Sequence, residues 1–271
     1  MKETVTVKWV KSRLGSRKIV LLDARSRRAY RLSHIPGARH ADMFHYFVPG
    51  TDAEGLGLFH RDLARILGNL GISRTETVVV YESGFGMRAA RVAWMLEYSG
   101  ARRVFMLEGG FRAWKRLHYP VDNRIVKSLP MTFDVAPNPS LLATVDQILD
   151  LPKTALVLDV RTRGEYDGTE KRECCERAGR IPNATWHEWT EFLGPNGRFL
   201  KKREFEKAFP DLQAKRTCPI VTYCHRGARA ASTFYALRSL GYSNVRNYVG
   251  SWHEWSSRSN LPLEPGSEAK S

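Results

Sequence analysis

The sequence has 271 residues, of which 42% are apolar and 26% are charged, and its formal net charge is +15. This apolar content excludes an intrinsically disordered chain, and no stretch approaches the roughly 18 uncharged apolar residues that a transmembrane helix needs. At about 100–200 residues per domain, the length predicts two domains. The first residues lack the apolar run of a signal peptide, so we expect a soluble, cytoplasmic protein.

The positive charge raises the question of nucleic-acid binding. The basic excess is spread along the chain, and its short runs, Arg27-Arg28 and Lys201-Lys202-Arg203, are typical of solvated surface. We therefore expect affinity for small anions and no role in nucleic-acid binding. A non-enzymatic RNA-binding module is the alternative, and a steep salt dependence of binding would reveal it.

The first half of the chain alternates short apolar runs with helical patterns. The runs are rich in β-branched residues, which is typical of strands buried on both faces of a parallel sheet. A helical pattern over residues 88–98 places Ala89, Val92, Ala93 and Leu96 on one face. In chain order, the landmarks of this half are IVLLDAR (19–25), HIPGA (34–38), TVVVY (77–81) and LEGGFRAW (107–114).

Matching landmarks recur in the same order in the second half, which indicates a tandem duplication. We expect two α/β domains, each a mainly parallel sheet flanked by helices. We place the N-terminal domain at residues 1–121, a proline-punctuated linker at 122–139 and the C-terminal domain at 140–271, with about ten extra residues near 164–179. The repeated landmarks are ALVLDVR (155–161), IPNA (181–184), PIVTY (219–223) and YVGSWHEW (248–255).

Cysteine usage limits the chemistry further. The chain has four cysteines, fewer than a secreted disulfide scaffold of this length would carry. The adjacent pair Cys174-Cys175 lacks the spacing of a zinc site. The sequence therefore predicts neither a metal nor a cofactor.

One loop carries a chemical signature, TYCHRGARAAS at residues 222–232. Cys224 falls where a buried strand ends, and a helix is expected from about Ala228, so backbone N–H groups should point into the turn. With Arg226 and Arg229 near in sequence, this setting favours a thiolate. Gly227 allows the tight turn. An inert core cysteine needs none of these features, so we predict that Cys224 is a nucleophile.

The ordered motifs resemble those of the two-domain rhodaneses, the thiosulfate sulfurtransferase family, over nearly the whole chain. The resemblance implies that the C-terminal domain is catalytic and that Cys224 carries sulfur as a persulfide. It also implies that the N-terminal domain is inactive, because Glu82 stands where its cysteine would be. The motifs that carry the resemblance are LLDAR, HIPGA, VVVYESG and LEGGFRAW in the first copy and LDVR, IPNA, TYCHRGARAA and NYVGSWHEW in the second.

The resemblance also implies how the loop works. The Cys224 thiolate would take the outer sulfur of thiosulfate and release sulfite, and an acceptor would then remove that sulfur. Cyanide, a dithiol, thioredoxin or a sulfur-relay protein fits as acceptor. Arg226 and Arg161 stand where the family places anion-binding residues, while an ion pair with Asp159 or Glu165 is the alternative for Arg161.

The remaining loop residues complete the candidate substrate site. Gly227 and Ala228 contribute backbone N–H groups to it. Arg229 either anchors the loop through its carbonyls or faces the substrate, and His225 either lines the site or is merely exposed. The chain departs from related enzymes in one respect, because Ser26-Arg27-Arg28 follows the first LDA motif where they often have a tryptophan.

Three other enzyme classes compete with this reading. A cysteine phosphatase or an arsenate reductase on a similar fold would need C-x5-R, but the sixth residue after Cys224 is Ala230 and Arg229 comes one position too early. A mercaptopyruvate sulfurtransferase would usually carry a small, neutral loop. The cationic loop found here favours the dianion thiosulfate as donor.

Overall fold

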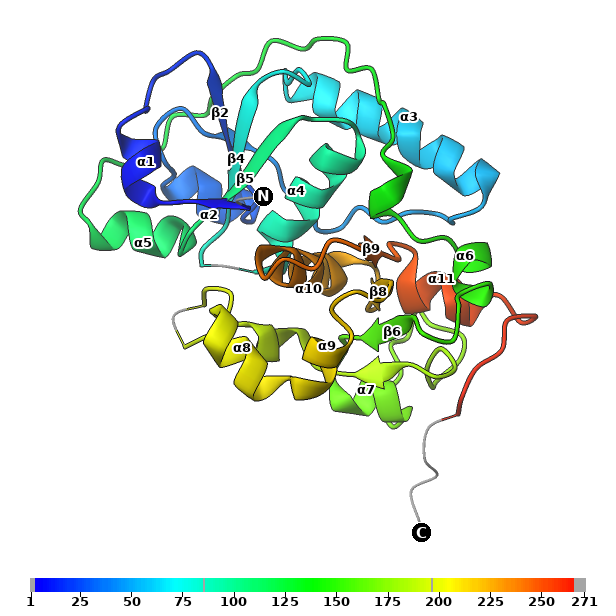
Figure 1. The fold of residues 1–271 in the computed structure, drawn as a ribbon. Helices are drawn as coiled ribbons and strands as arrows, with labels where there is room; N and C mark the ends of the chain where they lie inside the picture. Colours follow the sequence, from blue (N-terminus) through cyan, green and yellow to red (C-terminus); the bar gives the residue numbers. More distant parts are fainter. Residues whose placement is uncertain (1–2, 85, 196, 266–271) are drawn as a thin grey trace. The chain divides into compact units, whose positions relative to one another are not determined.

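The computed structural model describes residues 3–84, 86–195 and 197–265. The chain divides into two compact units, each of α/β architecture (Figure 1). The first unit comprises residues 1–46, 57–139 and 194–199, and the second comprises 47–56, 140–193 and 200–271. Two short segments, 47–56 and 194–199, thus belong to a different unit from their neighbours in sequence.

Residues 122–139, which the sequence suggests as a linker, lie against the first unit. The amide of Met131 donates to the carbonyl of Gly68 at 3.0 Å, and that of Ala136 donates to Ser99 at 3.1 Å. A backbone N–H that bonds to a folded unit is no longer free to sample other conformations. This segment is therefore part of the first unit and not a detached tether.

The first unit contains a sheet of five parallel strands in the order β1-β5-β4-β2-β3. Its central strand β4 is buried along Val78–Val80, as expected for a strand covered on both faces. The strands are β1 (Thr4–Val5), β2 (Ile19–Asp23), β3 (Arg39–His40), β4 (Thr77–Tyr81) and β5 (Arg103–Leu107), and the helices are α1 (Val7–Lys11), α2 (Arg27–Leu32), α3 (Ala53–Asn69), α4 (Met87–Tyr98) and α5 (Gly110–Arg116). The start of α3, up to residue 56, is grouped with the second unit.

The second unit repeats this plan with four parallel strands in the order β7-β6-β8-β9. The strands are β6 (Leu156–Asp159), β7 (Thr185–Trp186), β8 (Ile220–Tyr223) and β9 (Val245–Asn247). The α-helices are α6 (Val145–Leu149), α7 (Arg163–Asp167), α8 (Lys202–Ala208), α9 (Pro210–Ala214), α10 (Ala228–Ser239) and α11 (Ser251–Ser257), and two 3₁₀ turns cover Pro139–Leu141 and Trp189–Phe192. The predicted fold class, two tandem parallel α/β domains, is confirmed.

Helices cover both faces of the second sheet. Val221 and Tyr223 of β8 pack in one apolar cluster with α6 and α11. Thr222 points to the opposite face, where its hydroxyl donates to the Ala230 carbonyl of α10 at 3.2 Å. A strand buried on both sides is held rigidly, so the residue that follows β8 has a well-defined position.

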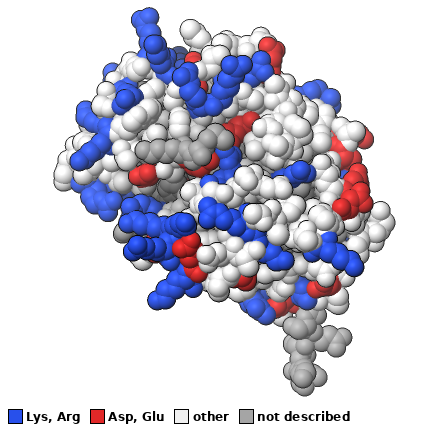
Figure 2. Space-filling view, viewed as in Figure 1, with Lys and Arg blue, Asp and Glu red and all other residues white. Residues whose placement is uncertain are grey.

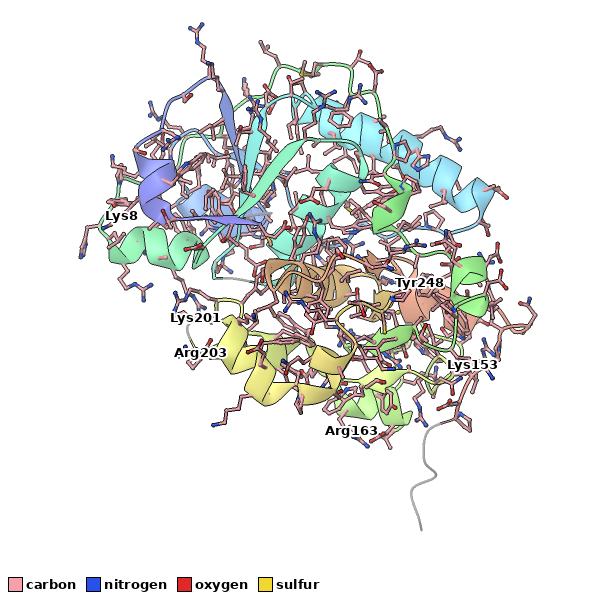
Figure 3. All side chains as sticks on the ribbon, viewed as in Figure 1. Lys8, Lys153, Arg163, Lys201, Arg203 and Tyr248 are labelled. Atoms are coloured by element: carbon pink, nitrogen blue, oxygen red, sulfur yellow. The ribbon has the colours of Figure 1, made fainter. Side chains whose placement is uncertain are left out.

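Charged residues are distributed over the surface without forming one basic patch on the face in view. Figure 2 shows Lys and Arg in many separate places, with Asp and Glu among them. The run at Lys201-Lys202-Arg203 is exposed at the start of α8, as predicted for solvated surface, and Figure 3 labels two of its side chains. Among the described residues, no helix combines the length and the apolar character required to cross a membrane.

Candidate active site

Cys224 directly follows β8, and its side chain is almost fully enclosed, at 1% exposure. Its amide donates to the hydroxyl oxygen of Ser251 at 3.1 Å, and its carbonyl accepts from the amide of Trp252 at 2.9 Å. The Ser251 hydroxyl in turn donates to the carbonyl of Tyr248 at 2.7 Å. The backbone on both sides of the thiol is therefore fixed by the start of α11.

The turn after Cys224 depends on a glycine. Gly227 has φ of +80°, and a Cβ added there would lie 2.8 Å from the carbonyl oxygen of Val249. The conformation and the space both exclude a side chain. Helix α10 begins at the next residue, and its first hydrogen bond runs from Ala231 to the Gly227 carbonyl at 3.0 Å. The N–H groups of the first turn of α10 therefore face the thiol loop with the positive end of the helix dipole.

Arg226 is half-buried in the middle of the loop. The central carbon of its guanidinium lies 4.0 Å from the ring centroid of Phe47. Phe47 is the first residue of segment 47–56, which belongs to the second unit. The Phe47 ring also lies 5.3 Å from that of His253. A cation stacked on an aromatic face keeps its charge while its position is restricted. The cation predicted from the sequence is therefore held beside the cysteine loop.

Arg229 makes a contact that the sequence did not foresee. It donates from Nη1 and Nη2 to the two carboxylate oxygens of Glu165 in α7, at 2.5 and 2.9 Å, and both side chains are buried. Burial by itself would lower the pKa of Arg229, but the bond to Glu165 and the negative charge of Cys224 outweigh it and raise the pKa. Arg229 thus anchors the first turn of α10 through a carboxylate, whereas the sequence suggested loop carbonyls or substrate.

Glu165 is correspondingly held as a carboxylate. Burial would raise its pKa, but the hydrogen bond and charge of Arg229 and the hydrogen bond of Arg172 hold the pKa well below its usual range. The Arg172 guanidinium contributes a further bond from Nε at 2.9 Å. Glu165 also accepts from both the amide and the hydroxyl of Thr162, each at 3.1 Å. A buried carboxylate with this many donors is a fixed support for α10.

Arg161 lies beneath the loop with 2% of its residue area exposed. Its guanidinium binds both carboxylate oxygens of Asp159, at 2.6 to 3.0 Å, and donates to the carbonyl of Gly179 at 2.8 Å. Tyr223 donates its hydroxyl to the same carboxylate at 2.6 Å. These contacts favour the ion-pair alternative for Arg161, while its role in binding substrate stays a prediction.

His225 is half-buried next to Cys224. Burial lowers the pKa of His225 to about 3, with help from the neighbouring charges of Arg172 and Arg226, so the imidazole is neutral at physiological pH. Its Nε2 lies 3.3 Å from the Sγ of Cys174, which comes from the ten-residue insertion of the second copy. His225 is therefore half-buried beside Cys174, and its role in lining the substrate site stays a prediction.

The matching loop of the first unit holds a carboxylate. The carbonyl of Glu82 accepts from the amide of Phe111 at 2.8 Å, and its side chain accepts from the amide of Ala89 at 2.8 Å. Burial raises the pKa of Glu82, and the N–H groups of Ala89 and Arg88 only partly offset it. The pKa of Glu82 therefore lies above the usual range of a glutamate, because the loss of water outweighs these hydrogen bonds.

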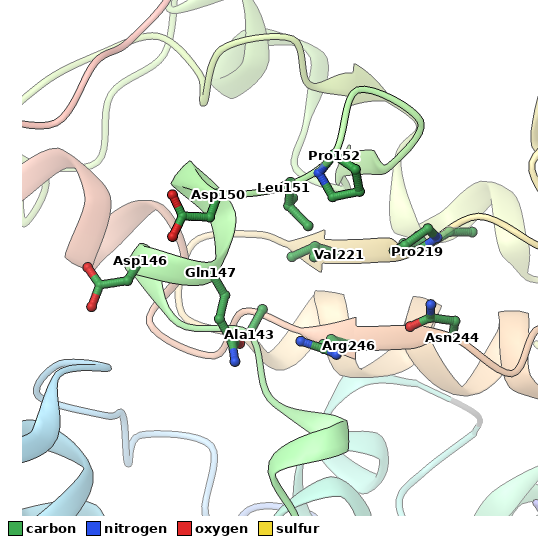
Figure 4. A pocket seen from close by; sticks show the side chains of 11 residues that line it. Ala143, Asp146, Gln147, Asp150, Leu151, Pro152, Pro219, Val221, Asn244 and Arg246 are labelled. Atoms are coloured by element: carbon green, nitrogen blue, oxygen red, sulfur yellow. The ribbon is translucent and has the colours of Figure 1, made fainter.

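A pocket of about 330 Å³ lies elsewhere in the second unit (Figure 4). It is lined by residues such as Asp146 and Leu151 from the α6 region and by Pro219 and Asn244, which lie at the starts of β8 and β9. Because the strands are parallel, this is the edge of the sheet opposite to Cys224. Its lining contains no cysteine, so the cysteine loop stays the candidate active site.

The roles of three contributors to the site were missed from the sequence, which named Glu165 only as a possible partner of Arg161. Glu165 could have been placed on a helix, because Thr162-x-x-Glu165 is a capping-box pattern and both of its hydrogen bonds form. Its pairing with Arg229, 64 residues away, has no local signal. Ser251 and Phe47 likewise lie far from Cys224 in sequence, and no motif marks them as loop supports.

The second unit is a parallel α/β domain that places a buried cysteine on a tight turn between an inner strand and a helix N-terminus. The rhodanese-like domain family matches residues 6–117 and 142–258, which is most of the chain. The chain belongs to the rhodanese-like family, with two tandem domains, as the resemblance predicted.

Curated relatives of similar length agree on sulfur transfer but differ in the donor they name. The chain is 31% identical to a thiosulfate sulfurtransferase of Pseudomonas aeruginosa over 93% of either chain. It is 32% identical to a probable 3-mercaptopyruvate sulfurtransferase of the same organism, over 97% of this chain and 98% of the relative. A thiosulfate sulfurtransferase of Corynebacterium glutamicum is 30% identical over 98% of this chain and 91% of its own. These relatives support sulfurtransferase activity.

Solved structures show the same fold at lower identity. The anaerobic ergothioneine biosynthesis enzyme of Chlorobium limicola, in complex with trimethyl histidine, superposes with a TM-score of 0.86 at 22% identity. The match covers 98% of this chain and 70% of that enzyme. At this identity the likeness defines the fold and not the substrate.

Proposed function

We propose that this protein is a thiosulfate sulfurtransferase that carries the transferred sulfur on Cys224. The observation that supports the proposal most is the setting of that thiol. It lies on a rigid turn at the positive end of α10, with the guanidinium of Arg226 on the same turn and that of Arg229 in the first turn of the helix. This setting stabilises negative charge on a sulfur nucleophile and on an anionic donor.

The chemistry proceeds in two displacements. The Cys224 thiolate attacks the outer sulfur of thiosulfate, an S–S bond forms, and the bond between the two donor sulfurs breaks with its electron pair leaving on sulfite. An acceptor nucleophile, such as cyanide or a dithiol, then attacks the outer sulfur of the persulfide and regenerates the Cys224 thiolate. The Cys224 thiolate is the nucleophile of the first step and the leaving group of the second, and a thiolate is suited to both roles.

We assign the cations of the site to different tasks. Arg226, half-buried and stacked on Phe47, is placed to bind the sulfonate oxygens of the donor. Arg229 and Arg161 are occupied by Glu165 and Asp159, so they support the loop from below and contribute charge at a distance. Gly227 and Ala228 shape the turn and supply backbone dipoles. The first unit, with Glu82 in the equivalent position, has no sulfur nucleophile there.

The acceptor and the place of action complete the proposal. Because Cys224 is 1% exposed, a compact acceptor such as cyanide or a dithiol group reaches its persulfide more readily than a bulky surface would. A thioredoxin-like protein would have to present its thiol on a protruding segment. We propose that the reaction takes place in the cytoplasm.

Donor choice is tested by removing the charge of Arg226, which lies on the cysteine loop itself. Arg226→Gly should raise the thiosulfate KM at least about tenfold, a loss of about 1.4 kcal/mol, because the dianion loses its partner. Turnover with mercaptopyruvate, which carries a single carboxylate, should change much less. Lys153→Gly, at an exposed turn of the same unit, removes the same charge away from the site and serves as the matched control.

A second candidate donor is kept because one relative is named a probable 3-mercaptopyruvate sulfurtransferase. Steady-state kinetics with both donors and cyanide as acceptor distinguish the two. A kcat/KM that favours mercaptopyruvate in the wild type would overturn the thiosulfate assignment. An equal loss of both activities in Arg226→Gly would show that Arg226 shapes the loop without selecting the donor.

A further inference from the structure

A second group of sulfur and nitrogen ligands lies beside the cysteine loop. Cys174, Cys175 and His225 each place one potential ligand atom within 4.8 Å of the other two. The distance from Cys174 Sγ to His225 Nε2 is 3.3 Å. All three residues belong to the second unit, and neither cysteine is in a disulfide bond. The mechanism proposed above uses neither cysteine.

The spacing of these atoms suits a tetrahedral metal ion. With Zn–S bonds near 2.3 Å and Zn–N bonds near 2.0 Å, neighbouring ligand atoms in a tetrahedral site lie roughly 3.5–3.8 Å apart. The distance between Cys174 Sγ and His225 Nε2 is already close to this value. The distances from Cys175 Sγ to these two atoms are at most 4.8 Å, so a small rotation of side chains would bring all three atoms to the required spacing. The two thiols and the imidazole can therefore converge on one ion without moving a strand or a helix.

The surroundings anchor one thiol and leave the other accessible. Cys175 is 3% exposed and packs in the core, and its amide donates to the Arg172 carbonyl at 2.9 Å while its carbonyl accepts from Lys171 Nζ at 2.8 Å. Cys174 is exposed. An ion could therefore enter from solvent on the side of Cys174 and meet ligands that are held from the side of Cys175.

We propose that Cys174, Cys175 and His225 Nε2 form a binding site for Zn²⁺, with a solvent molecule as the fourth ligand. Two thiolates and one neutral imidazole are a donor set that thiophilic, borderline-soft ions prefer over Mg²⁺ or Ca²⁺. Two thiolates also balance the charge of the ion, so the site needs no further carboxylate. The nearby guanidinium groups of Arg172 and Arg229 are paired with Glu165, which limits their repulsion of a cation.

Spacing rules applied to the sequence do not find this site, because His225 lies 51 residues from Cys174. The insertion that carries the two cysteines and the loop that carries His225 meet only in the folded chain. His225 is next to Cys224 in sequence, but none of the three proposed metal ligands takes part in the proposed sulfur-transfer steps. Its existence therefore does not depend on the proposed function.

The test uses the full-length Cys224→Ser protein, so that the catalytic thiol cannot bind the metal. The reduced, metal-free protein is titrated with Zn²⁺ in competition with a chromophoric chelator. We expect one Zn²⁺ per chain, and at least tenfold weaker binding after either Cys174→Ser or His225→Ala is added. Because Cys175 packs in the core, it is not substituted. Cys218→Ser, added to the same background, is the matched control and should leave binding unchanged.

Spectroscopy of the Co²⁺-substituted protein identifies the ligands independently. Thiolate coordination gives a sulfur-to-cobalt charge-transfer band in the near ultraviolet, which should weaken in the Cys174→Ser variant and persist in Cys218→Ser. The proposal is overturned if the Cys224→Ser protein binds no Zn²⁺ at equimolar concentration. It is also overturned if Cys174→Ser and Cys218→Ser bind Zn²⁺ equally well.

Discussion

In both units, a buried strand ends in a tyrosine, and the residue that follows it begins the loop to a helix. The carbonyls of Glu82 and Cys224 accept from equivalent amides, those of Phe111 and Trp252, at 2.8 and 2.9 Å. The carbonyl one position later also accepts from the start of the same helix in each unit. The first two residues of each loop are therefore held by the same backbone bonds, and the side chain presented there differs.

The support beneath the two loops is shared as well. In each unit an arginine two residues after the strand aspartate binds that carboxylate through Nε and Nη2, as in Arg25–Asp23 and Arg161–Asp159. These contacts support a structural role for both aspartates. The two units thus share this scaffold, and the loop position that holds Cys224 in the second unit holds Glu82 in the first.

The loops diverge at the residue that caps them. Ser251 has φ of +55° and its hydroxyl accepts from the Cys224 amide at 3.1 Å, whereas Gly110 has φ of +57° at the equivalent place. A Cβ on Gly110 would lie 2.1 Å from the carbonyl oxygen of Gly84, so no serine fits there. The second unit therefore accepts a strained side chain that secures the thiol, and the first unit does not.

The largest difference in stability between the loops should appear at the matched arginines Arg229 and Arg88. Arg229→Met leaves the buried carboxylate of Glu165 without its bidentate partner, and we expect the free energy of unfolding to fall by about 3 kcal/mol. This is at the low end for a broken buried ion pair, because Arg172 still binds Glu165. Arg88→Met removes a partly exposed pair with Asp42 and should cost about 1 kcal/mol or less. Hydrogen exchange measured separately on β8 and β4 amides would report each unit. Equal costs would contradict the assignment of Arg229 as a buried anchor.

A smaller effect should separate the loop glycines. Gly227→Ala forces a side chain into a left-handed conformation against Val249, and we expect a loss of about 1–3 kcal/mol together with reduced sulfur transfer. Gly84→Ala in the other loop meets no atom within 4 Å and has no such conformation, so it should be close to neutral. Denaturation midpoints and steady-state rates of both variants check this. A fully active Gly227→Ala enzyme would show that the tight turn is dispensable.

The smallest effect should come from Glu82, whose pKa is raised mainly by burial. A raised pKa means that the folded chain holds the proton more tightly than the unfolded chain, so stability falls as pH rises from the unfolded to the folded pKa. Glu82→Gln stays neutral and should therefore stabilise the first unit slightly at neutral pH. The gain should shrink toward about pH 4, near the ordinary glutamate pKa. Thermal unfolding of the wild type and of Glu82→Gln, measured as a function of pH, tests this. A stability gain that grows as the pH falls would contradict a raised pKa for Glu82.

The sequence was sufficient to predict the frame of the site. The repeated landmarks placed β8, Cys224 and the start of α10 correctly, because strands, tight turns and helix starts have local signals. The duplication also pointed to Glu82 as the equivalent of Cys224. The predicted fold class and family were confirmed because they too depend on these local signals and on their order along the chain.

Contacts between distant segments could not be predicted from the sequence. The Arg229–Glu165 pair, the cap from Ser251 and the stacking of Arg226 on Phe47 each join residues that no motif connects. The segment 47–56 follows the first-half pattern in sequence yet belongs to the second unit. Such pairings depend on how the chain closes in space, and a single sequence carries no local trace of that.

The most direct test of the difference between the loops is to locate the sulfur. The full-length protein is incubated with thiosulfate without an acceptor, and its intact mass and cysteine-containing peptides are measured. We predict that one sulfur atom is added, that it resides on the Cys224 peptide, and that Cys224→Ser gains none and loses at least about 99% of turnover. Sulfur found on Cys174, Cys175 or Cys218 in place of Cys224, or an active Cys224→Ser enzyme, would contradict the account.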